Sequence, residues 1–197
     1  MNDTHALILA SGSPRRRDLL TAAGYRFSAE NPGIEENEDT SLPIRQLTAE
    51  NARDKAAAVA ARFPEAVVVA ADTLVLLGDT VLSKPADREE ATRMLASLNG
   101  RSHEVFTAVA LRQERLGKAV DFTVTTAVHF KHLTPAEQAE YHSRIDPMDK
   151  AGAYAAQDHG SLIIDRIEGS MSNVIGLPMD EVAAALLEHF GITPEPR

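Results

Sequence analysis

The sequence predicts an α/β protein with a mixed central sheet flanked by helices. Apolar runs of strand length alternate with segments of helical periodicity, which is typical of this class. Helical connections join parallel strands, whereas the short turn Gly78-Asp79 joins antiparallel ones, so strands of both orientations are expected. We expect one domain over residues 1–197, with a disordered tail at about 193–197 that contains two prolines.

The first half of the chain predicts two helices and three strands. Ser13-Pro14 begins a helix, because Ser is a favoured N-cap and Pro is favoured at the first helical position, and Gly24 ends it. The second helix is expected over about 44–63. The strands are apolar runs near turn residues, at 6–10, 67–77 and 80–82.

The second half continues the alternation. Ala91, Met94, Leu95 and Leu98 follow the i, i+3, i+4, i+7 spacing of an amphipathic helix. Further helices are expected where Thr-Pro or Pro introduces a periodic segment, at 134–143 and 179–190, the latter stopped by a glycine. Further strands are expected at 104–112, 120–130 and 161–167.

Composition excludes several classes of protein. The chain has no cysteine, so disulfides, thiolate metal sites and cysteine nucleophiles are absent. A net charge of −9 argues against a general nucleic-acid binder. Apolar stretches fall short of the roughly 18–20 residues that cross a bilayer, and the N-terminus lacks a signal-peptide pattern. We therefore expect a cytoplasmic protein with neither nucleic-acid nor membrane partners.

Asp72 is the clearest break in these patterns. It interrupts the otherwise apolar strand 66–77. A lone ionised carboxylate in such a place is costly unless it is paired, bound to a metal or near solvent. Asp72 therefore either caps local backbone N–H groups at a bulge or strand end, or projects into a cleft as a metal ligand or general base.

Lys55 breaks the pattern of the second helix. Steps of four residues from Leu47 lead through Asn51 and Lys55 to Val59, so two polar side chains occupy an apolar stripe. One interpretation is that the Lys55 side chain extends along the stripe to reach water. The other is that the helix borders a polar cleft in which Lys55 meets an anion.

The segment Ser11-Gly-Ser-Pro-Arg-Arg-Arg17 joins a strand to a helix N-terminus. Unpaired N–H groups and the positive end of the helix dipole favour anions at such a junction. Arg15 and Arg16 offer bidentate contacts to phosphate oxygens. The segment is therefore either a phosphate site or an exposed basic first turn.

Several motifs together resemble the Maf family. They occur in the family's order and cover nearly the whole chain: Leu9-Ala-Ser-Gly-Ser-Pro-Arg-Arg16, Ala71-Asp-Thr73, Lys84-Pro85, Asp149-Lys-Ala-Gly-Ala-Tyr154 and Gly169-Ser-Met-Ser-Asn-Val-Ile-Gly-Leu-Pro178. The resemblance implies two lobes around a cleft, as in the inosine-triphosphate pyrophosphatases. It also implies hydrolysis of a nucleoside triphosphate between the α and β phosphates with a divalent metal, Mg²⁺ or Mn²⁺.

The resemblance also assigns residue roles. It makes Asp72 the catalytic carboxylate and, together with Glu36, a metal ligand; whether Asp72 acts as base or ligand stays open. It implies that phosphate contacts come from a set of hydroxyl and basic residues: Ser11, Ser13, Arg15, Arg16, Lys55 and Lys84.

Base specificity follows from the family's branches. Arg15, Thr73 and Gln157 match the branch acting on dTTP and UTP, whereas Met171 stands where relatives often have Tyr. The main alternatives are the same chemistry on a modified purine nucleotide such as 7-methyl-GTP, and a nucleotide-binding regulator of cell division and septum formation. A homodimer is a further implication of the resemblance.

Overall fold

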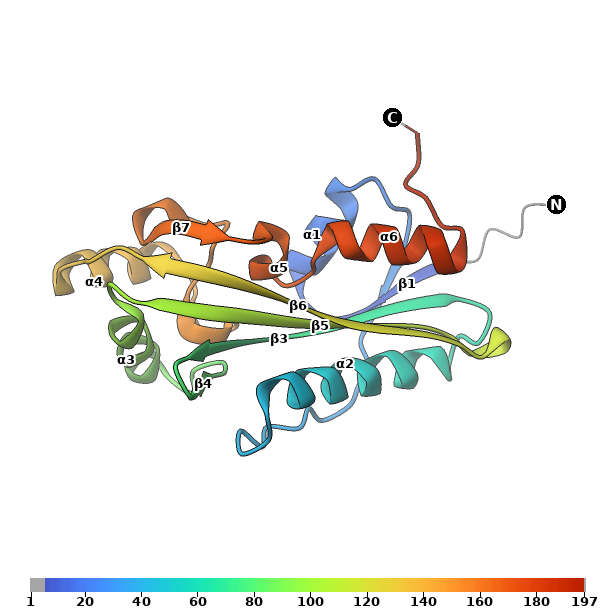
Figure 1. The fold of residues 1–197 in the computed structure, drawn as a ribbon, viewed down its shortest axis with the longest axis horizontal. Helices are drawn as coiled ribbons and strands as arrows, with labels where there is room; N and C mark the ends of the chain where they lie inside the picture. The colour runs from blue at the N-terminus through green and yellow to red at the C-terminus, as the bar shows by residue number, and fades with distance from the viewer. Residues whose placement is uncertain (1–5, 197) are drawn as a thin grey trace. The chain divides into compact units, whose positions relative to one another are not determined.

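The computed structural model describes residues 6–196 and contains a seven-stranded mixed sheet (Figure 1). The strand order is β2-β1-β3-β5-β6-β7, and β4 pairs with β3. β1 is parallel to β2 and β3, whereas β3–β4 and β6–β7 are antiparallel. The strands are β1 (Leu7–Ala10), β2 (Ser28–Glu30), β3 (Val67–Leu77), β4 (Thr80–Leu82), β5 (Ser102–Gln113), β6 (Lys118–Phe130) and β7 (Ile164–Glu168).

Helices connect these strands and follow the last of them. The α-helices are α1 (Pro14–Ala22), α2 (Ile44–Ala60), α3 (Arg88–Leu98), α4 (Pro135–Arg144), α5 (Met171–Ile175) and α6 (Met179–Phe190). Short 3₁₀ turns lie at η1 (Glu114–Leu116), η2 (Ala151–Ala153) and η3 (Gly160–Leu162). Among residues 6–196, no helix combines the length and hydrophobicity that a membrane span requires.

The chain divides into two compact units, each built from separate parts of the sequence. The first contains the residues up to Asp72, Thr107–Val124 and the residues from Gly176 onward. The second contains Thr73–Phe106 and Thr125–Ile175. The division passes through β3, β5 and β6, so the same strands contribute to both units. The expectation of one domain over the whole chain stays a prediction.

The first unit has apolar side chains on both faces of its strands. Leu7 and Leu9 pack in a cluster with α1 and α6, whereas Ile8 and Ala10 pack in a cluster with α2. This division follows from the two-residue period of a strand. Figure 1 shows α2 along one face of these strands and α1 and α6 along the other. A strand buried on both faces has an uninterrupted apolar sequence, as β1 does.

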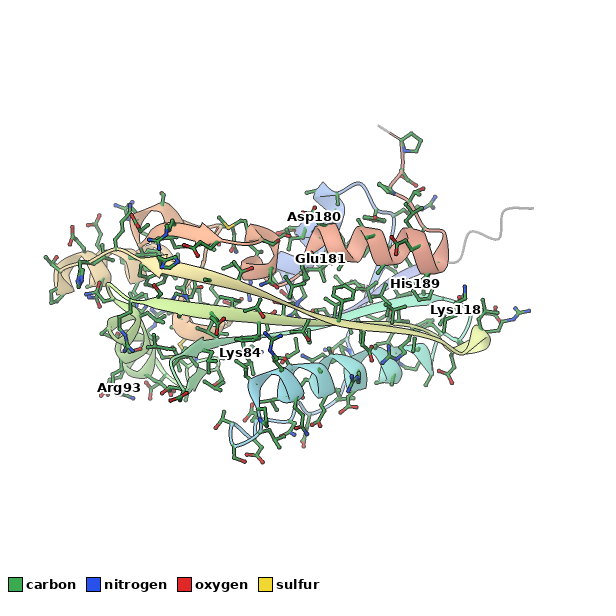
Figure 2. All side chains as sticks on the ribbon, viewed as in Figure 1. Lys84, Arg93, Lys118, Asp180, Glu181 and His189 are labelled. Atoms are coloured by element: carbon green, nitrogen blue, oxygen red, sulfur yellow. The ribbon has the colours of Figure 1, made fainter. Side chains whose placement is uncertain are left out.

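The residues at the ends of α6 suit the helix dipole. Asp180 and Glu181 lie in its first turn and His189 in its last, as Figure 2 shows. The Lys118 ammonium donates a hydrogen bond of 2.9 Å to the carbonyl oxygen of His189. Acidic groups at the N-terminus and cationic groups at the C-terminus each stabilise a helix slightly. Gly191 then ends α6 with φ 67°, a conformation that favours glycine.

Most elements lie where the sequence predicted them, but the strand expected at 161–167 is wrong in its first half. A left-handed residue, His159 with φ 57°, starts a 3₁₀ turn instead. The N–H of Ile163 donates to the carbonyl oxygen of Gly160, and strand pairing starts only at Ile164. The apolar run Leu162-Ile163-Ile164 therefore includes a turn with its first side chain 40% exposed. β2 and α5 were not predicted, because they are too short to show a period.

The segment predicted as a disordered tail has neither helix nor strand up to residue 196. The N–H of Glu195 nevertheless donates a hydrogen bond of 2.8 Å to the carbonyl oxygen of Gly24. Arg197 lies outside the described residues.

The second unit has a core of its own that includes a buried histidine. His103 on β5 is 3% exposed, and its Nε2 shares a hydrogen bond of 2.9 Å with the Tyr154 hydroxyl. Its ring meets that of Phe130 edge-on at 4.8 Å between centroids. Burial, and secondarily the charge of His129, lower the pKa of His103 to about 4. The imidazole is therefore neutral in the folded protein at neutral pH.

His103 should make the protein less stable as the pH falls from 6.5 to about 4. In this window the unfolded chain binds a proton at His103 and the folded chain does not, so unfolding is favoured. His103 contributes at most about 1.4 kcal/mol per pH unit to the slope of the free energy of unfolding against pH. His103→Gln should remove it, as measured by urea unfolding at several pH values.

Tyr154→Phe is the matched control, because it removes the hydrogen bond but keeps the titrating imidazole. It should lower stability at every pH and leave the slope unchanged. A His103→Gln variant with the wild-type slope would contradict the assignment.

Candidate active site

Asp72 lies on the face of β3 that meets α2. Val68 and Ala70 pack in the α2 cluster, and the two-residue period of the strand places Asp72 next on that face. The residue is 5% exposed. An ionised carboxylate this deeply buried requires a charged or hydrogen-bonding partner. The partner comes from α2.

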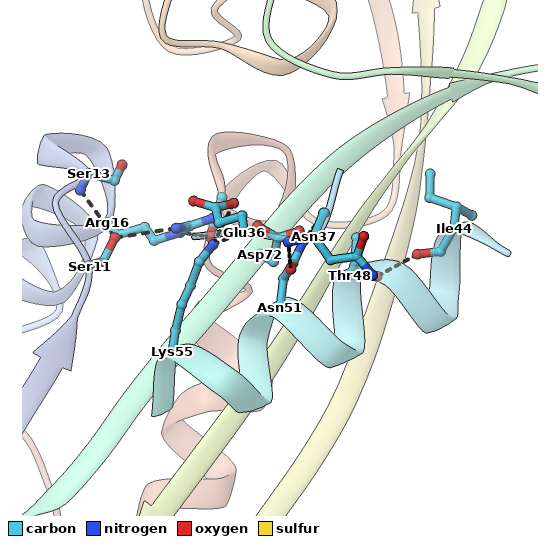
Figure 3. A network of polar contacts seen from close by, with 11 residues as sticks. Ser11, Ser13, Arg16, Glu36, Asn37, Ile44, Thr48, Asn51, Lys55 and Asp72 are labelled. Carbon is cyan, nitrogen blue, oxygen red and sulfur yellow. Dashed lines mark hydrogen bonds and ion pairs between the residues drawn. The ribbon is translucent and has the colours of Figure 1, made fainter. Parts of the chain in front are cut away.

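Lys55 supplies that partner. Its ammonium nitrogen lies 2.7 Å from Oδ1 of Asp72 and 2.9 Å from Oε2 of Glu36, as Figure 3 shows. The Lys55 side chain is 7% exposed, so it does not extend to water. The same stripe of α2 continues with Ala52, Ala56 and Val59 in the apolar cluster. Lys55 is thus a cation at the edge of a packed helix–sheet interface, held by two carboxylates.

Glu36 reaches Lys55 from the segment between β2 and α2. Its side chain is 38% exposed, against 8% for that of Asp72. The two carboxylates therefore differ in access to solvent although both contact one ammonium. Glu36 is thus the carboxylate that a group arriving from solvent can reach more easily.

Arg16 adds a second cation near the carboxylates. Its Nε donates a hydrogen bond of 2.7 Å to the carbonyl oxygen of Gly176, and its Nη1 donates one of 3.3 Å to the Ser11 hydroxyl. Burial lowers the pKa of Arg16, whereas the charges of Asp72 and Glu36 raise it. Arginine side chains are effectively always protonated in proteins, so Arg16 counts as a cation here.

The N-terminus of α1 favours an anion. Its N-cap residue, Ser13, makes no side-chain capping bond; instead the Ser13 N–H donates 3.1 Å to the Ser11 hydroxyl. The first turn contains no acidic residue, and Arg15 and Arg16 follow Pro14. Basic residues at a helix N-terminus oppose the dipole, so a negatively charged ligand there would relieve an unfavourable arrangement.

The donor set fits a hard divalent cation only in part. Among residues 6–196, no group of three or more His, Asp or Glu side chains gathers as a metal site. Two carboxylates, Glu36 and Asp72, nevertheless both contact the Lys55 ammonium. Mg²⁺ is commonly held by one or two carboxylates together with substrate phosphates and water. The residues present therefore fit a cation that arrives with a triphosphate.

The remaining predicted site residues belong to the second unit. Thr73 is half-buried on β3, directly after Asp72. Lys84 is exposed beyond β4 and is labelled in Figure 2. Gln157 is exposed, and its Nε2 donates 3.2 Å to Asp158. The structure thus gathers Ser11, Arg16, Glu36, Lys55 and Asp72 in the first unit, with Ser13 and Arg15 on the adjoining turn of α1.

Two residues join this cluster that the predicted site did not include. The Gly176 carbonyl holds Arg16, and Asn51 contacts the backbone next to Glu36. The polar position of Asn51 in an apolar stripe was a signal for it. Nothing in the sequence distinguishes the carbonyl of Gly176 from that of another loop residue.

Comparison with known proteins identifies the family. The family model described as Maf-like protein matches residues 6–189. The chain belongs to the Maf family. A curated relative named dTTP/UTP pyrophosphatase from Desulforamulus reducens is 44% identical over 186 residues, which cover 94% of this chain and 97% of the relative.

A second Maf relative has the same name. The dTTP/UTP pyrophosphatase of Akkermansia muciniphila is 46% identical over 180 residues, covering 91% of this chain and 94% of the relative. Among solved structures, the Staphylococcus aureus Ham1 protein aligns with a TM-score of 0.46 and 15% identity, over 79% of this Maf chain and 89% of that one.

Removing the Lys55 ammonium from this Maf protein should destabilise it strongly. Lys55→Met leaves Asp72 buried without its closest cation, and breaking a buried ion pair from one side costs about 3–5 kcal/mol. Adding Asp72→Leu removes the carboxylate that has lost its cation and should restore part of the lost stability. The free energy of unfolding in urea measures both variants.

Arg93→Met is the control. Arg93 pairs with Glu89 at 2.7 Å, but the two side chains are 62% and 84% exposed, so the loss should stay below about 1 kcal/mol. If Lys55→Met were as stable as Arg93→Met, the buried pair would not be a structural constraint.

Proposed function

We propose that the chain hydrolyses dTTP and UTP to the nucleoside monophosphate and pyrophosphate, with a divalent metal. The observation that supports it most is the Lys55 ammonium between Glu36 and Asp72, with Arg16 close by. This cluster combines cations for phosphate with carboxylates for a metal and a water molecule. The names of the Maf relatives agree with this activity.

Charge neutralisation explains the basic residues. A triphosphate carries about four negative charges, and cleavage between the α and β phosphates moves more charge onto the leaving pyrophosphate. Arg15, Arg16 and Lys55 oppose that charge, and the N–H groups of the first turn of α1 add partial positive charge. The hydroxyls of Ser11 and Ser13 donate to phosphate oxygens. Lys84 is a further phosphate contact.

Asp72 orients and deprotonates the attacking water. Its carboxylate can accept a hydrogen bond from water, and general-base assistance contributes about 10²–10⁴-fold to a rate. The oxygen of that water forms a bond to the α phosphorus while the bond from phosphorus to the β-bridging oxygen breaks. Pyrophosphate leaves with the bonding electrons, and the proton of the water passes to Asp72.

Glu36 and Asp72 would also hold the metal. A Mg²⁺ or Mn²⁺ ion bound there would supply positive charge against the phosphate oxygens. Lys55 contacts both carboxylates and would turn toward the phosphates when nucleotide binds. The two carboxylates are thus held in place before the cation and its triphosphate arrive.

Base recognition depends on Arg15, Thr73 and Gln157. The carboxamide of Gln157 can donate and accept at once, as the edge of uracil or thymine requires. The Thr73 hydroxyl has the same dual capacity. The homodimer and the cytoplasmic location stay predictions.

Pyrophosphate release from a panel of nucleotides is the direct test. The panel contains dTTP, UTP, ATP, GTP and 7-methyl-GTP, each with Mg²⁺, with Mn²⁺ and with EDTA. Release should come from dTTP and UTP and stop in EDTA, because without the cation the Glu36 and Asp72 carboxylates would repel the phosphate oxygens. Asp72→Asn should lower the rate at least about 10²-fold.

Asp79→Asn is the matched control, because Asp79 is an exposed aspartate in the turn after the same strand. It should retain the wild-type rate. Activity on 7-methyl-GTP alone would contradict the assignment of uracil and thymine as the recognised bases, but it would agree with the proposed hydrolysis. No release from any nucleotide would overturn the enzymatic proposal and favour a binding regulator.

A further inference from the structure

Asn51 binds both sides of one peptide segment next to Glu36. Its Oδ1 accepts a hydrogen bond of 2.8 Å from the N–H of Asn37, and its Nδ2 donates one of 3.0 Å to the carbonyl oxygen of Asn37 (Figure 3). The residue is 4% exposed. A buried carboxamide is costly unless both ends find partners, and here both partners belong to a single residue.

The segment that Asn51 binds has no strand or helix. In the described structure, the other hydrogen bonds of residues 37–42 stay within the segment, such as Asp39 N–H to Asn37 Oδ1 at 2.9 Å and Leu42 N–H to Asp39 O at 3.2 Å. Asn51 therefore supplies the hydrogen bonds that attach this stretch to α2. Glu36 precedes it directly.

Helical spacing joins this attachment to the ion pair. Asn51 and Lys55 are four residues apart and lie on the same face of α2. Lys55 binds the Glu36 carboxylate, and Asn51 binds the backbone of the following residue. One helix face therefore determines the position of both the side chain and the main chain at this point.

We propose that Asn51 is a positioning residue that places Glu36 for binding of the metal–triphosphate complex. This inference rests on the proposed function. Without Asn51, residues 36–40 sample other conformations, and only the fraction with Glu36 beside Asp72 binds the complex. The apparent dissociation constant rises by the inverse of that fraction. A tenfold loss of population therefore gives about tenfold weaker binding.

The test compares Asn51→Leu with Thr48→Val. Thr48 lies less than one turn before Asn51, is fully buried, and its hydroxyl donates 2.8 Å to the Ile44 carbonyl oxygen inside the same helix. Thr48→Val thus removes a buried hydrogen bond from α2 without touching the segment at Asn37. It controls for a general loss of stability.

An affinity measurement and steady-state kinetics together separate an effect on binding from an effect on the chemical step. Electron paramagnetic resonance of Mn²⁺ with α,β-methylene-UTP measures the affinity for the complex without turnover, and steady-state kinetics with UTP give KM and kcat. Asn51→Leu should weaken Mn²⁺ binding and raise KM about tenfold, with kcat within about twofold of wild type. Thr48→Val should leave all three values unchanged.

Amide hydrogen exchange tests the attachment without any ligand. Exchange at residues 36–40 should be faster in Asn51→Leu than in wild type and in Thr48→Val. Unchanged exchange, unchanged Mn²⁺ affinity or an equal effect of Thr48→Val would overturn the role of Asn51. If the wild-type protein turned over no nucleotide while exchange behaved as expected, the proposed function would fail and the attachment of the segment would stand.

Discussion

The buried ammonium of Lys55 joins three parts of the first unit: β3, α2 and the segment that carries Glu36. Lys55 and Asp72 are each nearly inaccessible to solvent, and their charged atoms lie 2.7 Å apart. Neither charge is stable there without the other. The strand, the helix and the segment are therefore constrained to one arrangement, and the candidate site is part of what holds the unit together.

The face on which this cluster lies follows from the pleat of the strands. Side chains of β1 and β3 alternate between the α2 cluster and the α1–α6 cluster. Asp72 continues the α2 side, so it meets a helix whose own apolar stripe is interrupted by Asn51 and Lys55. Two interruptions of apolar patterns, distant in sequence, thus lie opposite each other. The same geometry that builds the core also brings the charges together.

Much of this could be predicted from the sequence, because long apolar runs and clear helical periods determine the elements. The alternation predicted the mixed sheet, and a polar cleft was one of the two interpretations of the breaks at Lys55 and Asp72. The contact between them could not be predicted, since neither pattern specifies which helix packs on which strand. The turn at His159 could not be predicted either, because an apolar run of three residues fits a strand and a buried turn equally well.

The strand β2 and the position of the Glu36 side chain could not be predicted for a different reason. Acidic residues in an irregular segment are usually solvated, and nothing in that stretch indicates that the Glu36 side chain turns inward. Its position depends on contacts from α2, which the fold alone supplies. The residue patterns left phosphate and metal roles open as alternatives, the family resemblance assigned them to residues, and these roles stay predictions.

A crystal structure with Mn²⁺ and α,β-methylene-UTP, analysed by anomalous diffraction, addresses the role of the two carboxylates directly. We expect an anomalous peak at the Glu36 and Asp72 carboxylates and the triphosphate against Lys55 and Arg16. A manganese ion bound elsewhere, with Lys55 still between Glu36 and Asp72 while nucleotide is present, would contradict the assignment of these carboxylates as metal ligands.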